Sequence, residues 1–303
     1  MQLLKLIRWP NLLMIAFIQI VIKYALLQSF GVAMALDHLH FALLVLISIG
    51  LAAAGYIIND VYDVDADVVN KSKNVFINTS ITEKTAYNLF FAFNILSIGL
   101  GFYLSNAIGK SSFFSFFVMI SISLYVYASS LKRMPFVGNI IISALVGFSV
   151  LIVGIFDVVP MIYPGNASTQ STILDILLDY ALFAFIITLL REMIKDIEDI
   201  DSDYKAGYNT LPIAIGRERA KKIAFAVSFL PMAAIIYYIV TYLYMHTVLI
   251  IYFLLFLLAP LLYVSIKLFL AKTQAHYAHI SFVLKLIMLF GIISMILFKY
   301  ILK

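Results

Sequence analysis

The sequence predicts an all-α polytopic membrane protein that crosses the bilayer with nine helices. Of its 303 residues, 64% are hydrophobic and only 12% are charged, whereas a soluble domain is roughly half apolar and about a quarter charged. One aqueous core could not bury that much apolar surface. The chain also contains nine apolar segments near the length of about 20 residues that a membrane-spanning helix needs. We therefore expect residues 1–303 to form a single transmembrane domain.

The first half of the chain supplies five of the expected spans. These spans are 11–30, 41–59, 86–105, 113–130 and 138–156. Gln19 and Lys23 interrupt the first one, and its apolar run is too long for the core of a signal peptide, so we expect no cleavage near residues 33–35. We expect the Lys23 side chain to extend toward the outer membrane surface. The alternative is a phosphate or carboxylate partner for Lys23 within the membrane.

The second half of the chain supplies four further spans. These spans are 173–192, 222–242, 247–270 and 279–299. The stretch before the seventh span contains Gly207, Thr210, Pro212 and Gly216, which are typical of turns.

Positive charge in the connecting segments is concentrated on one side of the expected spans. The basic residues on that side are Lys5, Arg8, Lys71, Lys73, Lys84, Lys132, Arg133, Lys195, Lys205, Arg217, Arg219, Lys221, Lys222 and Lys272. The loops on the other side contain only Lys110. By the positive-inside rule, we expect the N-terminus and the basic loops to face the cytoplasm of a bacterial or archaeal cell. Nine spans then put the C-terminus outside, a position that Lys299 and Lys303 fit poorly.

Composition excludes several kinds of chemistry. The chain has no cysteine, so disulfides, thiolate catalysis and cysteine metal sites are ruled out. The net charge of +5 reports membrane topology rather than nucleic-acid binding. The five histidines show no metal-ligand spacing with the acidic residues.

Acidic residues gather in two windows, 60–67 and 192–203, each at the expected cytoplasmic end of a span. Three carboxylates in each window have the spacing i, i+3, i+7: Asp60, Asp63 and Asp67 in the first, and Asp196, Asp199 and Asp203 in the second. On a helix this spacing places all three within about 60° of one another. Asp65 and Asp201 stand at i+5 in both windows, and we expect them to point away from the shared face.

Three carboxylates on one helical face repel one another, so a positive partner is expected. Mg²⁺ fits, because it takes one or two carboxylates and completes its shell with water and phosphate oxygens. Two such faces opposed across a cavity would hold a diphosphate through metal ions, and basic side chains would neutralise the remaining phosphate charge. The basic residues near the windows are Lys71, Lys73, Lys132, Arg133, Arg191 and Lys195. The alternative is a solvated acidic loop at the membrane edge.

These residues resemble the motifs of the UbiA superfamily of intramembrane prenyltransferases. Its first motif, NDxxDxxxD, is matched by Asn59, Asp60, Asp63 and Asp67, and its DxxDxxxD-type second motif by the second aspartate set. The segments "IRWPNLL" (7–13) and "SLKRMP" (130–135) are also similar. The resemblance implies a UbiA-type ring of nine helices around a central cavity, open sideways to lipid and capped by the two acidic loops.

The resemblance also implies the reaction. A prenyl diphosphate would lose its diphosphate with Mg²⁺ as cofactor, and an acceptor would attack the allylic cation. The six aspartates would be the metal-binding and catalytic residues. Asn59 and the six basic residues would bind the substrates. In the first motif's loop, "NKSKNVFIN" lacks the basic residue followed by proline that is common in the family, so either Lys71 or Lys73 would take that role or the role is absent.

The stretch "KDIEDIDSDYKAGYNTLPIAIG" (195–216) is most similar to the digeranylgeranylglyceryl phosphate synthase branch. This similarity implies a donor of the geranylgeranyl type and a prenylated glycerol phosphate as the acceptor. An aromatic acceptor of the quinone or homogentisate type is the alternative.

Two further residues are candidates for the substrate site. Asn11 stands at the cytoplasmic start of the first span, where it would either cap a helix or face the cavity; the resemblance favours the cavity. Tyr127 lies one turn before "SLKR" and would either line the site or belong to an interfacial aromatic belt.

Other functions fit the sequence less well. A CDP-alcohol phosphotransferase would carry a DGxxAR signature, which the chain lacks. A cation transporter usually places its carboxylates near the bilayer midplane, whereas these cluster at one face. The expected partners are the prenyl diphosphate, a lipophilic acceptor and membrane lipid, with no nucleic acid and no obligatory protein partner.

Overall fold

The computed structural model describes residues 2–64 and 75–298. Within these ranges nine helices are long and apolar enough to cross a membrane, as the sequence predicts. They are Trp9–Leu27, His38–Tyr62, Glu83–Ala107, Ser111–Ser129, Val137–Met161, Ala167–Lys205, Arg217–Leu243, Thr247–Leu270 and Gln274–Leu297. This is the architecture of a multi-pass integral membrane protein.

Turns of π- and 3-10-helix divide some of these spans into shorter α-helices. The α-helices are α1 (Gln2–Leu6), α2 (Trp9–Val21), α3 (His38–Tyr62), α5 (Glu83–Ala107), α6 (Phe114–Ser129), α7 (Val137–Val153), α8 (Ala167–Lys205), α9 (Leu211–Ile215), α10 (Arg217–Val227), α11 (Phe229–Tyr238), α12 (Thr247–Phe253), α13 (Ala259–Leu270) and α14 (Gln274–Leu297). The largest departure from prediction is α8, which continues well past the expected end at residue 192. The second acidic window is therefore part of this helix, which ends at Lys205.

Local sequence explains where several of these helices begin. The Asp37 carboxylate accepts a hydrogen bond from the backbone N–H of His40 at the start of α3. The Thr82 hydroxyl accepts one from the N–H of Thr85 at the start of α5. Both are N-cap contacts that satisfy an N–H group left without an intrahelical partner. Pro10 stands in the first turn of α2, where a missing N–H costs nothing.

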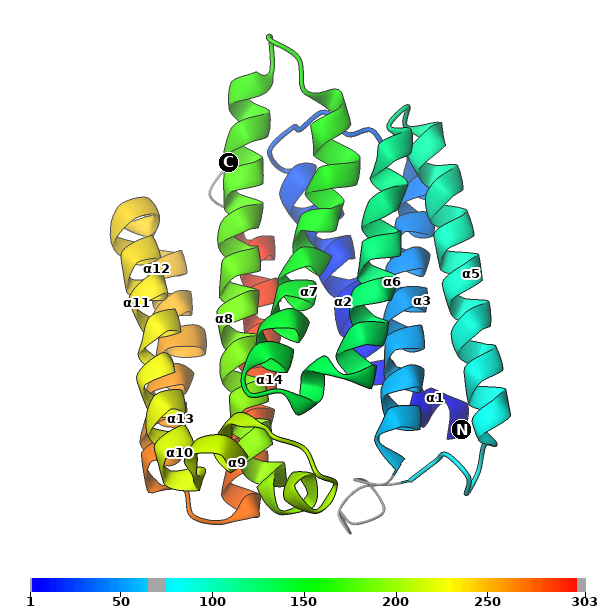
Figure 1. Cartoon of the computed structure of the whole chain (residues 1–303). Helices are drawn as coiled ribbons and strands as arrows, with labels where there is room; N and C mark the ends of the chain where they lie inside the picture. Colours follow the sequence, from blue (N-terminus) through cyan, green and yellow to red (C-terminus); the bar gives the residue numbers. More distant parts are fainter. Residues whose placement is uncertain (1, 65–74, 299–303) are drawn as a thin grey trace.

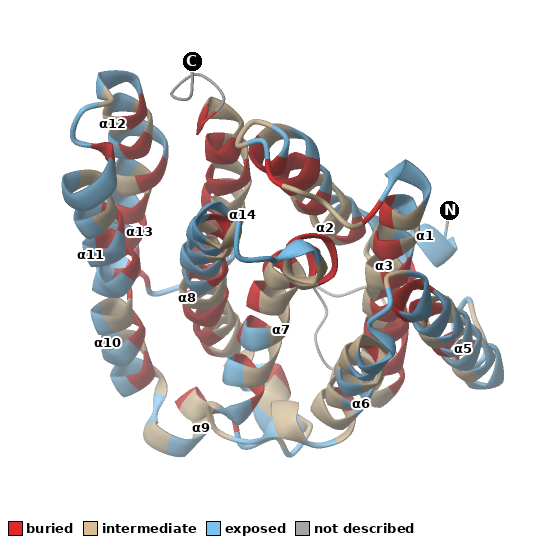
Figure 2. Ribbon diagram, turned by 90° about the horizontal axis from the view of Figure 1, so that it is seen from above, coloured by how far each residue is buried: buried red, intermediate tan, exposed pale blue. Residues whose placement is uncertain are grey.

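Contacts between neighbouring helices join six of the spans in a closed ring, and Figure 2 views the helices end-on. Successive neighbours around the ring are α2, α3, α6, α7, α8 and α14, with α14 packing back against α2. The other three spans lie outside it: α5 packs on α3, and the helices from α10 to α13 pack against α8 and α14 (Figure 1). The structure therefore refines the expected arrangement, because the helices that surround the cavity are a subset of the nine.

The contact between α7 and α8 depends on a small residue. A Cβ atom added to Gly147 would lie 2.9 Å from the backbone oxygen of Ala181. Only glycine permits such a close approach of the two backbones, a device common in membrane helix packing. The two helices on which much of the cavity is built are therefore held in a fixed relationship.

The expected position of Lys23 is wrong. Its side chain is 2% exposed, and its Nζ lies 2.6 Å from Oδ2 of Asp157, whose side chain is fully buried. Lys23 sits in the π-helical turn Ile22–Leu27 and Asp157 in the π-helical turn Gly154–Val158. These turns direct the two side chains toward each other, so Lys23 finds a carboxylate partner rather than the membrane surface.

Candidate active site

A cavity of about 770 Å³ lies inside the ring. Its lining residues come from the N-terminal segment, all six ring helices, and the segments that follow α3, α6 and α8. Apolar side chains such as Phe117, Ile152 and Met295 line part of it, whereas Asp63, Asp196 and other charged side chains line another. The described part of the chain thus places a charged region and an apolar region in one continuous space, within the size range of small-molecule sites.

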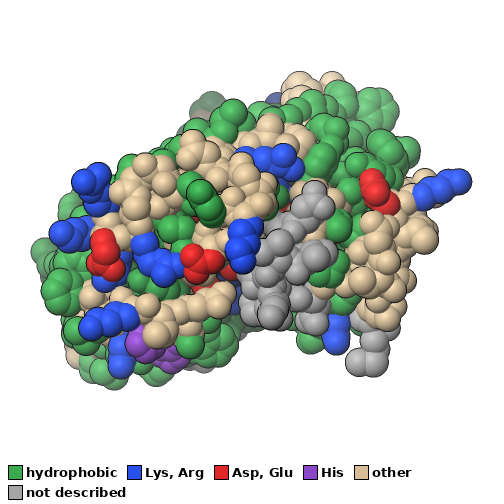
Figure 3. Space-filling model, turned by 60° about the horizontal axis from the view of Figure 1, so that its bottom comes forward, with side chains coloured by type: hydrophobic (Ala, Val, Ile, Leu, Met, Phe, Trp, Pro, Cys, Tyr) green, Lys and Arg blue, Asp and Glu red, His purple; other side chains and the backbone are tan. Residues whose placement is uncertain are grey.

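The charged region lies at the end of the bundle where α3 and α8 finish (Figure 1). Figure 3 looks toward this end and shows Lys, Arg, Asp and Glu side chains gathered there, with hydrophobic side chains behind them. The prediction that the two acidic windows share one face of the protein is therefore consistent with the arrangement of the helices.

Among the described aspartates of the first motif, Asp63 lines the cavity. It follows the last residue of α3 and receives several hydrogen bonds. Lys132 Nζ lies 2.6 Å from its Oδ1, Tyr208 Oη lies 2.8 Å from the same oxygen, and Asn59 Nδ2 donates to Oδ2 at 2.7 Å. Lys132 also donates to Asn59 Oδ1 at 3.3 Å, so the lysine and the asparagine hold the carboxylate between them.

Tyr208 is a residue of this site that the sequence reasoning did not select. Burial raises the pKa of its phenol, and the neighbouring Asp63 carboxylate raises that pKa further. The phenol therefore remains protonated near neutral pH and donates its hydrogen bond to Asp63. The guanidinium of Arg133 stacks over the Tyr208 ring at 5.1 Å. Arg133 is exposed and supports the tyrosine rather than lining the cavity.

Asp60 lies differently from its neighbour in the motif. Its Oδ1 accepts a hydrogen bond from Arg8 Nη2 at 2.8 Å, and its side chain is 12% exposed. Arg8 lines the cavity and Asp60 does not. The remaining predicted residues of this window and its loop, Asp67, Lys71 and Lys73, lie outside the described residues, as does Asp65.

The second motif behaves as its spacing predicts. Asp196, Asp199 and Asp203 all belong to α8 and all line the same cavity as Asp63. Asn139 on α7 donates to Asp196 Oδ2 at 2.9 Å. Asp201 points away, with an 87% exposed side chain that pairs with Arg217 at 3.1 Å. Aspartates from two windows that are 136 residues apart in the sequence therefore line the same cavity.

The donor set fits a metal ion that is shared with a phosphate. Within residues 2–64 and 75–298, no three acidic or histidine side chains converge closely enough to hold a metal by themselves. Mg²⁺ requires only one or two carboxylates when phosphate oxygens and water complete its shell. The carboxylates that face the cavity are Asp63, Asp196, Asp199 and Asp203. Because no three of them converge, this set suits a metal and diphosphate bound together better than a metal bound alone.

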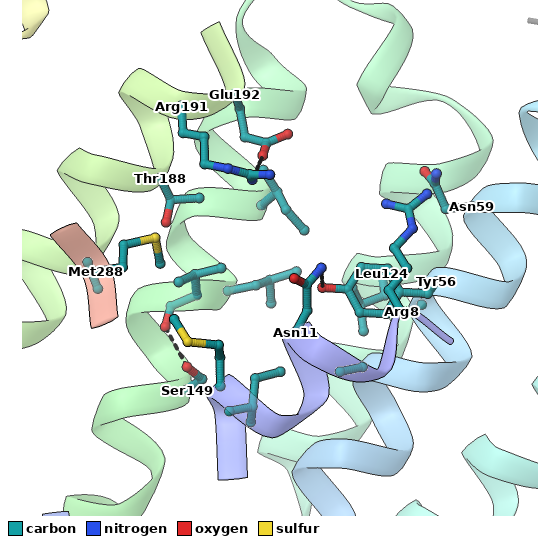
Figure 4. Close-up of a pocket in the computed structure, with 18 of the residues that line it drawn as sticks. Arg8, Asn11, Tyr56, Asn59, Leu124, Ser149, Thr188, Arg191, Glu192 and Met288 are labelled. Atoms are coloured by element: carbon teal, nitrogen blue, oxygen red, sulfur yellow. Dashed lines mark hydrogen bonds and ion pairs between the residues drawn. The ribbon is translucent and has the colours of Figure 1, made fainter. Parts of the chain in front are cut away.

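The other predicted substrate-binding residues lie in two separate parts of the site. Asn59 and Lys132 lie at Asp63, whereas Arg191 and Lys195 line the cavity from α8. Figure 4 shows Arg191 and Glu192 on one side of the cavity and Arg8 and Asn59 on the other. The Arg191 guanidinium lies 2.8 Å from the Glu192 carboxylate.

Asn11 and Tyr127 both line the cavity. Asn11 donates to the Tyr56 hydroxyl at 3.1 Å (Figure 4) and makes no capping hydrogen bond. Tyr127 lies on the cavity wall from α6, so it is not one of the belt tyrosines on the outer surface.

Lys285 is a second cavity residue that the sequence analysis does not predict. It lies on α14 within the predicted ninth span and lines the cavity. An ionisable residue inside a span is a reason in itself to suspect function, so this signal was present in the sequence.

Comparison with known proteins identifies relatives of the chain. The sequence profile of the UbiA prenyltransferase family matches residues 16–293. The chain is 32% identical over 195 residues to digeranylgeranylglyceryl phosphate synthase of Thermococcus gammatolerans, a match that covers 62% of this chain and 63% of that protein. It is 32% identical over 234 residues to the protein of the same name from Methanococcoides burtonii, covering 76% and 77% respectively. The first match thus spans less than two thirds of the relative's length.

The fold is similar to solved structures over nearly the whole chain. A structure of digeranylgeranylglyceryl phosphate synthase aligns with a TM-score of 0.60 at 22% identity, covering 97% of this chain and 98% of the other. A UbiA homolog from Archaeoglobus fulgidus bound to GPP and Mg²⁺ aligns with a TM-score of 0.56 at 20% identity, covering 97% and 99%. The fold class predicted from the sequence is therefore confirmed.

Proposed function

The chain belongs to the UbiA prenyltransferase family, and from that premise we propose that it transfers a geranylgeranyl-type group from its diphosphate to a prenylated glycerol phosphate. Mg²⁺ is the proposed cofactor. The curated relatives are named for digeranylgeranylglyceryl phosphate, and a similar structure holds a prenyl diphosphate with Mg²⁺, which supports this choice of substrates and cofactor.

One observation carries the proposal. Asp63 after α3 and three aspartates of α8 face one cavity, and that cavity continues into apolar walls. A prenyl diphosphate has the same division, with a highly charged head and a hydrocarbon tail. The carboxylate region suits the head through a metal ion, and the apolar region suits the tail because burial removes it from water.

The charged residues of the site have different proposed roles in the reaction. Asp63, Asp196, Asp199 and Asp203 would hold Mg²⁺, which neutralises charge on the departing diphosphate. Lys132 holds Asp63 in place and adds positive charge beside the diphosphate. Asp60 acts through its ion pair with Arg8 at the cavity edge.

The proposed reaction exchanges one carbon–oxygen bond for another. The bond between prenyl C1 and the diphosphate oxygen breaks, and its electron pair leaves with the diphosphate. The hydroxyl oxygen of the acceptor then bonds to C1, and its proton passes to the released diphosphate. The Tyr127 ring lines the cavity, and an aromatic face of this kind can stabilise the intermediate cation. Apolar walls keep water from competing as the acceptor.

Two features of the proposal concern the whole chain. Residues from Lys5 to Met295 line the cavity, which supports treating 1–303 as a single prenyltransferase domain. The basic loops favour a cytoplasmic position for the N-terminus and the charged end of the cavity.

The test is a transfer assay with the purified full-length protein and a panel of substrates. Several prenyl diphosphates are combined with glycerol phosphate derivatives, hydroxybenzoate, homogentisate and naphthoate acceptors, and product masses are measured. We expect a digeranylgeranylglyceryl phosphate-type product that requires Mg²⁺. Product from aromatic acceptors alone would overturn the proposed acceptor, and ion flux without any transfer would overturn the enzyme assignment.

A further inference from the structure

A second group of polar side chains lines the cavity away from Asp63. We call Thr188, Arg191, Lys195 and Lys285 the basic subsite; the first three belong to α8 and Lys285 to the adjacent α14. Figure 4 shows Thr188 and Arg191 on the same wall of the cavity. Among the described residues, Lys285 makes no hydrogen bond or ion pair, and the charges that act on it most strongly are the cations Arg191 and Lys195.

Two atoms of the basic subsite are buried without a hydrogen-bond partner in the part of the chain that the structure describes. They are Oγ1 of Thr188, whose residue is 4% exposed, and Nε of Arg191. Leaving a buried polar atom unpaired is costly, and native proteins rarely do so. Both residues line the cavity, so a ligand bound in that cavity is the natural partner for their polar groups.

The charge of the basic subsite specifies the ligand. Arg191, Lys195 and Lys285 supply three positive charges, and Glu192, which pairs with Arg191, supplies one negative charge. The balance of two positive charges matches a phosphate monoester, which carries about −1.5 to −2 at neutral pH. A guanidinium, two ammonium groups and a hydroxyl also suit the several acceptor oxygens of phosphate. An aromatic carboxylate carries a single charge and would leave the subsite unbalanced.

Most of the basic subsite lies deeper than the place proposed for the diphosphate. Thr188 and Arg191 precede Asp196 by eight and five residues on α8, which is about 12 Å and about 7.5 Å along the helix axis, whereas Lys195 adjoins Asp196. Lys132 and Tyr208 lie with Asp63, at the end of the bundle. A diphosphate bound through metal at the aspartates therefore leaves the deeper part of the basic subsite available for a second anion.

We propose that the basic subsite binds the phosphate of the acceptor, with Lys285 as a residue that determines acceptor specificity. This inference rests on the proposed prenyl transfer to a glycerol phosphate and adds where the acceptor's charge is bound. The two substrates then have separate anion sites in one cavity, one dependent on metal and the other formed by the protein's own cations.

The experiment measures binding and kinetics in the full-length protein reconstituted in zwitterionic lipid. Geranylgeranylglyceryl phosphate and the corresponding alcohol without phosphate are titrated in the absence of Mg²⁺ and donor. The chain has one tryptophan, Trp9, and it lines the cavity, so its fluorescence reports occupancy. We expect the phosphate ester to bind at least about tenfold more tightly than the alcohol, because charge-assisted hydrogen bonds are lost with the phosphate.

Variants then assign the effect to the subsite. In Lys285→Met, we expect the preference for the phosphate ester to fall about tenfold and the KM for the acceptor to rise similarly, with the KM for the donor unchanged. Lys285→Arg should restore part of the preference. Lys267→Met makes the same chemical change at an exposed position outside the cavity and should leave all three quantities unchanged.

Thr188→Val provides a second, independent variant. It removes an unpartnered buried hydroxyl, so the protein should be no less stable, yet acceptor binding should weaken. An unchanged preference for phosphate in both variants, or a rise in the donor KM alone, would overturn the inference. Absence of transfer by the wild-type protein with every acceptor would instead overturn the proposed function.

Discussion

Lys23 and Asp157 form an ion pair of 2.6 Å inside the membrane-spanning region, with side chains 2% and 0% exposed. Lys23 also donates to the backbone oxygen of Leu36 at 2.6 Å, and Asp157 accepts from the N–H of Leu36 at 2.8 Å. The pair thus ties the first span, the segment before α3 and the end of the fifth span together. It lies apart from the cavity lining, so its role is structural.

Breaking this pair should destabilise the protein. Lys23→Met leaves a buried carboxylate without its cation, and losing one partner of a buried pair costs about 3–5 kcal/mol. The double variant Lys23→Met with Asp157→Asn should be less destabilised than the sum of the single variants, because it leaves no buried charge without a partner. Thermal unfolding in detergent measures both effects. Additive losses would show that the two side chains are not coupled.

The aspartates that face the cavity should be required for transfer, and a neighbour on the same helix should not. Asp63→Asn and Asp199→Asn remove proposed metal ligands, so we expect activity to fall by about a hundredfold or more at saturating substrate. Asp201→Asn is the matched control, because Asp201 is exposed and its surface pair with Arg217 contributes little. Initial rates across a Mg²⁺ titration test this. Full activity in Asp199→Asn would refute the proposed metal site.

The hydrogen bond from Tyr208 to Asp63 should tune the affinity for metal and donor. Tyr208→Phe removes a donor 2.8 Å from Asp63 Oδ1 but keeps the ring that stacks under Arg133. We expect the KM for the prenyl diphosphate to rise roughly tenfold, as is typical for losing one hydrogen bond to a charged group. The KM for the acceptor should change little. Equal changes for both substrates would mean that Tyr208 shapes the whole cavity.

Gly147 should be intolerant of any side chain. Gly147→Ala places a Cβ atom 2.9 Å from the Ala181 oxygen, so α7 and α8 must separate, and we expect a loss of about 1–3 kcal/mol. Gly99→Ala on α5 is the control, because its Cβ would meet no atom within 4 Å. That change should be neutral or stabilising by up to about 1 kcal/mol. The thermal unfolding midpoints of the two variants test this prediction, and equal midpoints would contradict it.

The proposed orientation can be tested by single-cysteine labelling, because the chain has no cysteine of its own. Lys110→Cys and Asp201→Cys place a thiol at exposed positions on the two sides. With a membrane-impermeant maleimide we expect labelling of Lys110→Cys in intact cells and of Asp201→Cys only after permeabilisation. The reverse result would place the charged end of the cavity outside the cell.

The sequence alone determined that the protein is a polytopic membrane protein with nine spans. It also determined which aspartates of the second motif share one face of their helix. Apolar length reports a span whatever surrounds it, and spacing along a helix fixes which side chains share a face. Asp196, Asp199 and Asp203 therefore line one cavity as predicted, while Asp201 turns away.

Only the tertiary structure decided which residues meet. Asp60 pairs with Arg8 and Lys23 with Asp157, and Lys285 joins Arg191 on the cavity wall. The ion pairs Arg8–Asp60 and Lys23–Asp157 join distant parts of the chain, as does the placement of Arg191 and Lys285 around one cavity, so no local period encodes them. Helix periodicity specifies the direction of a side chain from its own axis, whereas its partner depends on which helix packs beside it.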